Sequence, residues 1–487
     1  MVNIRDLSST MRNFSMEPNE VKITHLSHAE NQRREAKRLR VPLDQVGSVG
    51  ATDHVVTLSH AGTHVDALWH FGPFSEGKPS TKIDQIPLEW CFGSGVLLDF
   101  SHKKPAEAIT TEDLKKELER IHYSLKPMDI VLIRTGAEDF DDDPRFEKMA
   151  SGLVKESLMW LLDRGVMNIG TDAYTLDVPL PFMAEELKKG NKDAFFPVHY
   201  AGRERSYIHV EKLYNLKSLP RPFGFKVALF PIKIEDGAGG WTRAVAIEGE
   251  GELTKKPDLL DLSVPIRTQS LEDEEIIVNH LTHEEAARRL ARRFGVRTKS
   301  LPTPDLYAND EISCSSHAGT HVKAPWHFAP VVEGTPAKTI DRVPLDRLYG
   351  DGVLLDFSHK RSNDPITPAD LNRELDRIGY GLNPGNIVLI RTGAEDLFFN
   401  DPGFIEKAAK VSSDSLLWLF EKGITTVGTD SCISAVVHKA KIIKDTCYAE
   451  KMYNLKKLPR PTGFKVCLFP IKLENCSGAW TRAVAIL

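Results

Sequence analysis

The sequence has no excess of basic residues and no long apolar run. It contains 63 Lys and Arg against 68 Asp and Glu in 487 residues, a formal net charge of −5, and charges of both signs are interspersed. A nucleic-acid-binding protein is expected to carry a basic patch or stripe, so nucleic acid is excluded as a partner. No run approaches the roughly 18 apolar residues of a membrane span, and the first twenty residues lack the apolar core of a signal peptide. We therefore expect a cytoplasmic protein with no membrane partner.

Cysteine is scarce and unevenly distributed. Only Cys91 lies in the first half of the chain, and the other five cysteines lie in the second half. The two halves otherwise repeat each other, so disulfides that supported the fold would be expected in both. We therefore expect reduced thiols.

What the sequence does contain is one unit written twice. The segment "GVLLDFSHK" occurs at residues 95 and 352, "IVLIRTGAED" occurs at 130 and 387, and "LPRPFGFKVALFPIK" at 219 returns as "LPRPTGFKVCLFPIK" at 458. With 41% hydrophobic and 27% charged residues, the chain has the composition of globular domains. These matches predict two similar domains, residues 1–248 and 257–487, joined by the polar, glycine-containing linker "EGEGELTKKPD".

Each copy alternates short apolar runs with helical patterns. In copy one, "VVTLS", "GVLLDF", "DIVLIRT" and "FKVALFPIKI" predict strands, while "AENQRREAKRL", "TEDLKKELERI" and "KESLMWLLDRG" predict helices. A threonine cap followed by acidic residues marks the helix start at "TTEDL". The fold class of both domains is therefore α/β.

The segment "SHAGTHVDALWHF", residues 59–71, concentrates side chains that bind metals. It holds three histidines and one aspartate, namely His60, His64, Asp66 and His70. If residues 56–70 form one strand, side chains at every second position share a face, so these four point the same way. Gly62 leaves room there and permits a kink that brings His60 and His64 closer together. Two imidazoles and a carboxylate predict a divalent metal site with positions left for water, whereas single histidines in such runs are more often structural.

The same residues resemble a known family. "HAGTHVDALWH" is similar to the H-x-G-T-H-x-D-x-P-x-H signature of the cyclase-like metal hydrolases, which include bacterial kynurenine formamidase, isatin hydrolase and polyketide cyclases. The resemblance runs along both copies, from "DLS" through "GTD" to the C-terminal "RAVA", and Leu68 replaces the proline of the signature without changing the ligand positions. It implies two tandem copies of the kynurenine formamidase/cyclase-like fold, a mixed β-sheet or barrel core with flanking helices, arranged as a pseudo-dimer.

The resemblance also implies ligands far from the motif. The family carries a distal histidine and glutamate twelve residues apart, and His199 and Glu211 have this spacing. By resemblance, His60, His64 and Asp66 hold one ion, and Asp66 with the distal pair holds a second where two are present. Glu211 also begins an apolar rhythm of leucines, so a position on the solvent face of a helix is the alternative. We expect the cofactor to be a divalent metal, zinc or manganese.

The implied chemistry is the hydrolysis of a small molecule. A divalent ion supplies hydroxide near neutral pH and polarises a carbonyl, so we expect opening of C–N bonds in small amides, formamides or cyclic amides. His70, outside the ligand set, is the candidate general acid and base, or alternatively an orienting histidine. Aromatic residues beside His70 and His199 suit an arylamide substrate or belong to the core. Two rival functions stay open: a cyclase or dehydratase acting on a carbonyl-rich metabolite, and a pseudoenzyme that only binds a small molecule.

Copy two departs from this pattern at one ligand position. Lys323 stands where copy one has Asp66, and an ammonium group cannot ligate a metal, although it can pair with Glu450 as a built-in cation. Copy two keeps the other matching positions, His317, His321, His327, His438 and Glu450. It lacks the counterpart of residues 178–196, which we interpret as a lid over the site or a neutral insertion. We expect copy one to be catalytic and copy two to be a degenerate structural half of an intramolecular pseudo-dimer, with further homo-oligomerisation left open.

Overall fold

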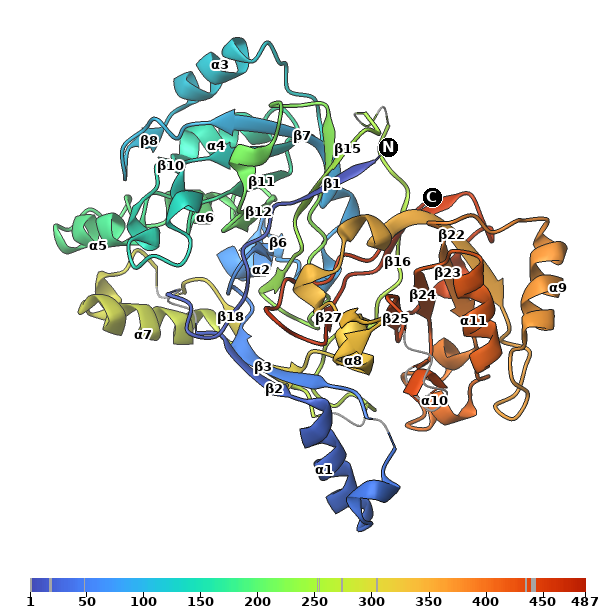
Figure 1. Cartoon of the computed structure of the whole chain (residues 1–487). Coiled ribbons are helices and arrows are strands. Elements are labelled where there is room, and N and C mark those ends of the chain that lie inside the picture. Colours follow the sequence, from blue (N-terminus) through green and yellow to red (C-terminus); the bar gives the residue numbers. More distant parts are fainter. Residues whose placement is uncertain are drawn as a thin grey trace. The chain divides into compact units, whose positions relative to one another are not determined.

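The computed structural model describes residues 2–16, 20–47, 49–251, 253, 255–272, 275–303, 305–433, 436–438 and 444–487 (Figure 1). Residues 252 and 254 of the predicted linker lie outside the described residues. The chain forms two compact units, each built from three segments. Unit 1 contains Met1–Val21, Thr57–Pro257 and Val278–Ile312, and unit 2 contains Lys22–Val56, Asp258–Ile277 and Ser313–Leu487.

The core of unit 1 is a mixed nine-stranded sheet. Its four consecutive strands β7, β9, β11 and β12 pair in parallel, and all other neighbours pair antiparallel. In order across the sheet, the strands are β1 (Asn3–Asp6), β15 (Val245–Glu248), β13 (Phe225–Ala228), β7 (Phe92–Asp99), β9 (Ile130–Arg134), β11 (Asn168–Thr171), β12 (Ile208–Glu211), β4 (His64–Asp66) and β14 (Gly239–Trp241).

The parallel strands of unit 1 form because their sequences are apolar along their whole length. Every residue of β11 is buried, as is every residue of β9 except Arg134, which is the pattern of parallel strands covered on both faces. Helices α3 (Thr111–Arg120) and α4 (Lys155–Leu162) contribute Leu114 and Leu158 to the same apolar cluster as Val131 of β9. The predicted start of α3 is confirmed, because the Thr110 side chain accepts a hydrogen bond from the Asp113 amide.

Unit 2 repeats this sheet strand for strand, which confirms two tandem copies of one α/β fold. Its four parallel strands β22, β23, β24 and β25 correspond to those of unit 1. In order across the sheet, the strands are β16 (Leu259–Asp261), β28 (Val484–Ile486), β26 (Phe464–Cys467), β22 (Tyr349–Asp356), β23 (Ile387–Arg391), β24 (Thr426–Thr429), β25 (Cys447–Glu450), β19 (His321–Lys323) and β27 (Gly478–Trp480).

The remaining α-helices and strands lie outside the two nine-stranded sheets. The other helices are α1 (His28–Leu39), α2 (Leu68–Phe71), α5 (Leu180–Lys188), α6 (Pro197–Ala201), α7 (His283–Phe294), α8 (Pro325–Phe328), α9 (Pro368–Ile378), α10 (Phe404–Lys407) and α11 (Ser413–Glu421). The other strands are β2 (Lys22–Leu26), β3 (Thr52–Leu58), β5 (Phe74–Ser75), β6 (Lys78–Pro79), β8 (Ala108–Ile109), β10 (Gly152–Leu153), β17 (Ile277–Leu281), β18 (Asn309–Ser315), β20 (Val331–Val332) and β21 (Thr335–Pro336).

Within the described residues, none of the helices combines the length and apolar character that crossing a membrane requires. All six cysteines are described, and none forms a disulfide, as expected.

Each unit includes a segment of the other sequence copy. Residues 278–312, from the start of copy two, belong to unit 1, and residues 22–56 of copy one belong to unit 2. In unit 1, Leu290 and Ala291 of α7 belong to the same apolar cluster as Leu187 of α5, and Figure 1 shows the two helices side by side. Helix α5 lies in the segment 178–196 that copy two lacks. The predicted domains 1–248 and 257–487 therefore describe the sequence copies, whereas the compact units exchange these two segments.

Candidate metal centre

The histidine-rich motif is not one continuous strand. Strand β3 ends at Leu58, a turn covers residues 59–63, β4 spans His64–Asp66, and helix α2 follows. The prediction of a single strand over residues 56–70 is wrong because Gly62 adopts a left-handed conformation, with φ of 57°, and the Ala61 amide donates a hydrogen bond to Leu58 O. The turn, and not strand alternation, brings His60 to the strand that carries Asp66.

Strand β4 lies between β12 and β14, and this position brings the distal glutamate to the motif. His64 is the cross-strand partner of Glu211, and Asp66 is the partner of His209. Glu211 is the last residue of β12 and is only 6% exposed. The alternative that it lies on the solvent face of a helix is therefore wrong.

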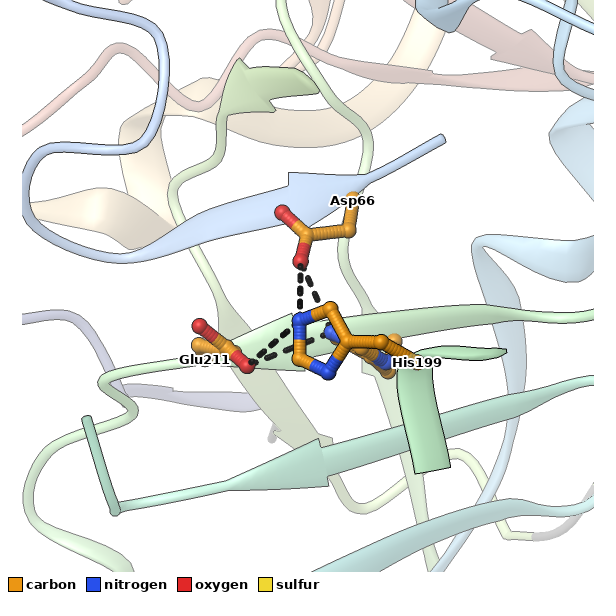
Figure 2. Close-up of side chains that lie close together, drawn as sticks. Asp66, His199 and Glu211 are labelled. Carbon is orange, nitrogen blue, oxygen red and sulfur yellow. Dashed lines mark hydrogen bonds and ion pairs between the residues drawn. The ribbon is translucent and has the colours of Figure 1, made fainter. Parts of the chain in front are cut away.

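The distal histidine comes from a short helix. His199 lies in α6, and its Nδ1 is 2.6 Å from Oδ2 of Asp177. The Asp177 carboxylate also accepts hydrogen bonds from the amides of Val198 and His199. These contacts fix the ring so that its Nε2 faces Asp66 and Glu211 (Figure 2).

Two groups of ligand atoms meet at the Asp66 carboxylate. On one side, Nε2 of His60 and Nε2 of His64 lie 3.1 and 3.2 Å from Asp66 Oδ1. On the other side, Nε2 of His199 lies 3.7 Å from Asp66 Oδ2 and 3.8 Å from Glu211 Oε1. All five predicted ligands, His60, His64, Asp66, His199 and Glu211, are therefore together in unit 1, and none is more than 6% exposed.

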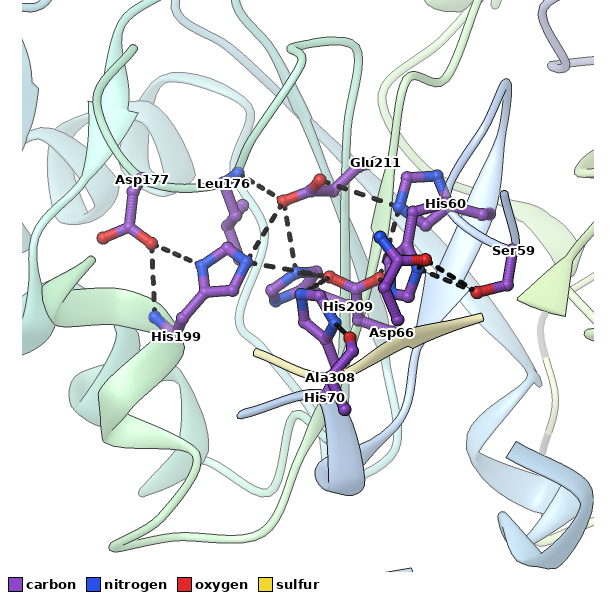
Figure 3. A network of polar contacts seen from close by, with 12 residues as sticks. Ser59, His60, Asp66, His70, Leu176, Asp177, His199, His209, Glu211 and Ala308 are labelled. Atoms are coloured by element: carbon purple, nitrogen blue, oxygen red, sulfur yellow. Dashed lines mark hydrogen bonds and ion pairs between the residues drawn. The ribbon is translucent and has the colours of Figure 1, made fainter. Parts of the chain in front are cut away.

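The histidine tautomers suit metal binding, because Nδ1 of each histidine ligand is held by a partner outside the centre, as Figure 3 shows for His199 and Asp177. Nδ1 of His60 donates to Asn309 Oδ1 at 2.9 Å, and Nδ1 of His64 donates to Gly62 O at 2.8 Å. With the proton on Nδ1, the lone pair of a neutral imidazole is on Nε2, which faces the centre. The carbonyl or carboxamide partner of each ring thus sets both its orientation and its protonated nitrogen.

The chemistry of this donor set fits a divalent ion. Among the described residues, none forms a hydrogen bond with Oδ1 of Asp66 or with Nε2 of His64, although both atoms are buried. Such buried polar atoms are costly unless a partner is supplied. Burial opposes ionisation of Asp66, but the histidines around it outweigh burial and hold the pKa of this carboxyl well below its usual value. These histidines lower the pKa of Asp66 when they are protonated, and a bound cation would supply the positive charge in place of those protons. A carboxylate with imidazoles that have given up this proton is the ligand set of zinc and similar first-row ions.

His70 lies beside both ligand groups. Its Nδ1 is 2.6 Å from Ala308 O, and its Nε2 is 3.6 Å from Asp66 Oδ2. The ring stacks on Tyr307 with centroids 5.0 Å apart, and burial lowers its pKa well below the usual value. The hydrogen bond to the Ala308 carbonyl leaves the Nε2 lone pair of neutral His70 directed at the centre.

A cavity of about 200 Å³ opens onto these groups in unit 1. Its polar end is lined by the side chains of His60, His64, His70, His199 and Glu211. Its apolar wall includes Phe196 of copy one, together with Leu290 and Tyr307 from residues 278–312 of copy two. Arg289 and Arg293 also line the cavity. The expected aromatic wall is thus present in part, because Phe196 lines the cavity while Phe71 packs in the core. Leu180 of the segment 178–196 lines the cavity too.

Four residues near the ligands were not anticipated. His209 lies two positions before Glu211 on β12, so strand alternation could have revealed it. Asp177 has no recognisable motif around it. Ala308 and Asn309 come from copy two, more than 230 residues from their partners, and no local signal could identify them.

The matching centre of unit 2 is filled by an ion pair. Lys323 Nζ lies 2.7 Å from Glu450 Oε2, and the Glu450 carboxylate also accepts a hydrogen bond from the Ile433 amide. Burial favours the neutral amine, but the charge of Glu450 outweighs it and raises the pKa of Lys323, while the pKa of Glu450 falls to about 2. Nε2 of His317 is held by Ser477 Oγ at 2.8 Å. The ammonium group thus occupies the carboxylate that a cation would need.

Several solved structures are similar to about half of this chain. A solved isatin hydrolase bound to the product analogue thioisatinate is 19% identical, with a TM-score of 0.41, covering 51% of this chain and 93% of that chain. Isatin hydrolase A from Ralstonia solanacearum is 21% identical, with a TM-score of 0.41, covering 51% and 92%. A structure described as a potential metal-dependent hydrolase with cyclase activity is 18% identical, with a TM-score of 0.37, covering 51% and 100%.

The assignment to a family rests on a match to a family sequence model. The Cyclase model, described as "Putative cyclase", matches the chain twice, over residues 6–178 and 260–434. The first match contains the histidine-rich motif of copy one, and the second contains its counterpart in copy two. Because these matches span well over half of the sequence, the chain belongs to the Cyclase family and carries two tandem copies of its domain.

Proposed function

We propose that this protein is a metal-dependent hydrolase that opens C–N bonds in small amides, formamides or cyclic amides, with its active centre in unit 1. The observation that carries the proposal is the Asp66 carboxylate, whose two oxygens face two separate sets of histidine Nε2 atoms. His60, His64, Asp66, His199 and Glu211 would hold the metal, either zinc or manganese. An ion held there would lower the pKa of a bound water toward neutrality and would polarise a carbonyl oxygen.

The residues of the chain supply the proton transfers and the positioning. His70 Nε2 carries a lone pair in the neutral form, so it can accept a proton from the attacking water and return it to the leaving nitrogen. His70 lies outside both ligand groups, which keeps this nitrogen available.

The cavity walls favour a small, planar substrate. Phe196 and Tyr307 supply aromatic faces, and the volume of about 200 Å³ suits an arylformamide or a bicyclic amide. Apolar walls also keep bulk water away from the reacting bond.

Removal and return of the metal tests the proposed function. We expect protein treated with a chelator to lose hydrolysis of a panel of arylformamides and cyclic amides such as isatin, and to regain it on addition of Zn²⁺ or Mn²⁺. Elemental analysis of the untreated protein should find metal. A protein that is purified without metal, and that binds neither ion in a calorimetric titration, would favour the rival view of a pseudoenzyme that only binds a small molecule.

His70 can be tested separately from the metal. We expect His70→Gln to lower kcat by about 10²–10⁴-fold, the usual contribution of a general acid and base, while the metal content stays that of the wild type. Loss of the metal in this variant would instead make His70 a ligand.

A cyclase or dehydratase remains the second candidate, because the family model that matches the chain is named for cyclases. The same residues would then hold an ion whose positive charge would stabilise an enolate of a carbonyl-rich metabolite. Assaying ring opening and ring closure on the same pair of compounds separates the two functions. Cytoplasmic localisation and assembly into homo-oligomers stay predictions.

A further inference from the structure

We propose that His209 is a metal ligand, and that Asp66, His199, His209 and Glu211 together form a second metal site that is closed to water. The neighbouring site of His60, His64 and Asp66 would then be the open one, at which the reacting water is held. This inference rests on the metal dependence proposed above, and it adds a residue that the resemblance to the family does not supply.

The four donor atoms lie within 4.8 Å of one another, and four of their six separations are close to those of a tetrahedral ligand set. Nε2 of His209 lies 2.7 Å from Asp66 Oδ2 and 3.2 Å from Glu211 Oε1. Nε2 of His199 lies 3.7 and 3.8 Å from the same two oxygens. Around a tetrahedral ion with bonds of about 2.0–2.1 Å, ligand atoms are about 3.3 Å apart, so the observed distances bracket the required value.

The backbone places His209 in this position. It is the cross-strand partner of Asp66 in the pair β12–β4, and it shares a face of β12 with Glu211 two residues later. The side chain is fully buried, and its Nδ1 lies 3.2 Å from the hydroxyl of Tyr207. Nε2 is therefore the nitrogen that faces the carboxylates.

The two sites differ in the number of ligands that the protein supplies. Four protein ligands saturate a tetrahedral ion, as in structural zinc sites, whereas three leave a position for water. Asp66 serves both sites because Oδ1 faces His60 and His64 while Oδ2 faces His209. The open site also lies next to Nε2 of His70, whose ring is 4.1 Å from that of His60 between centroids.

Copy two has neither a histidine at the position of His209 nor an aspartate at the position of Asp66. Tyr448 stands at the position of His209, and it is the cross-strand partner of Lys323, which stands at the position of Asp66. The cross-strand pair of Asp66 and His209 in copy one is thus replaced by the pair of Lys323 and Tyr448 in copy two. Tyr448 supplies the matched position for a control variant.

The experiment counts ions and records their coordination. In the full-length wild type we expect two ions per chain by elemental analysis. We expect His209→Ala and His209→Gln to weaken one of the two Co²⁺ binding steps by at least about 100-fold in a calorimetric titration, since losing even an outer-shell partner costs 10–100-fold. The visible spectrum of the Co²⁺ protein should lose its intense four-coordinate bands in these variants. The other binding step and the far-UV circular dichroism should not change.

Tyr448→Phe is the control, and it should leave both binding steps unchanged. The inference is overturned if the wild type binds one ion while His209→Ala binds two, because His209 would then exclude the second ion. It is also overturned if both His209 variants bind two ions with wild-type affinity. In either case, the proposed function still stands if the wild-type protein hydrolyses amides in a metal-dependent way. A wild-type protein that binds no metal would contradict both the proposed function and the role of His209.

Discussion

Replacement of Asp66 with asparagine is expected to remove metal from both ligand groups and to abolish hydrolysis. The carboxylate is shared, with Oδ1 facing His60 and His64, and Oδ2 facing His199 and His209. The amide keeps the size of the side chain but loses the negative charge and one of the two oxygen donors. Elemental analysis and calorimetric titration with Zn²⁺ and Mn²⁺ should show no specific binding.

The matched histidines of the two copies provide the control for this result. His64→Ala should also reduce metal binding, whereas His321→Ala, at the corresponding position of copy two, should leave the metal content unchanged. Circular dichroism should report wild-type secondary structure in all three variants. An Asp66→Asn variant that keeps wild-type metal content would show that the ion is held elsewhere.

Replacement of Asn309 with alanine is expected to lower metal affinity by about 10–100-fold, together with activity, although Asn309 belongs to copy two. Its side-chain oxygen accepts the hydrogen bond from His60 Nδ1 and thereby fixes the nitrogen that binds the ion. In the variant this nitrogen keeps only the contact with Ser59 Oγ, which also lies 2.9 Å away, so the ring is held less firmly and the ligand is less well preorganised. Calorimetric titration of the metal-free variant measures the loss.

Thr52 occupies the position in copy one that corresponds to Asn309, and it belongs to unit 2. Thr52→Ala should therefore leave metal affinity and activity unchanged. If Asn309→Ala behaves like the wild type instead, His60 is oriented without help from copy two, and the structural role proposed for that copy loses its main support.

The duplication, the α/β class and the individual strands could be predicted because they depend on local patterns. Apolar runs such as residues 130–134 and the cap at Thr110 are short-range signals, and the structure confirms both. The exchange of residues 22–56 and 278–312 could not be predicted, because the two segments have similar sequence patterns and no local signal shows which unit each of them joins.

The candidate site was predictable to the extent that its spacing was distinctive. The spacing of His60, His64 and Asp66 is local, and the distal pair was found only through the resemblance to a family. His209 was missed because the leucines after Glu211 suggested a helical rhythm, which hid the alternation of a four-residue strand. The partners of the histidine Nδ1 atoms were missed because backbone carbonyls and distant side chains leave no trace in a motif.

The placement of residues 278–312 in unit 1 implies that different parts of copy two are under different selection. After a duplication, one copy can lose residues that the other copy retains, and the ion pair of Lys323 with Glu450 is consistent with the loss of a metal ligand in copy two. Residues 278–312 of copy two, however, line part of the cavity in unit 1 and hold the Nδ1 atoms of His60 and His70. We therefore expect this segment to remain under purifying selection, whereas the residues around Lys323 are expected to vary.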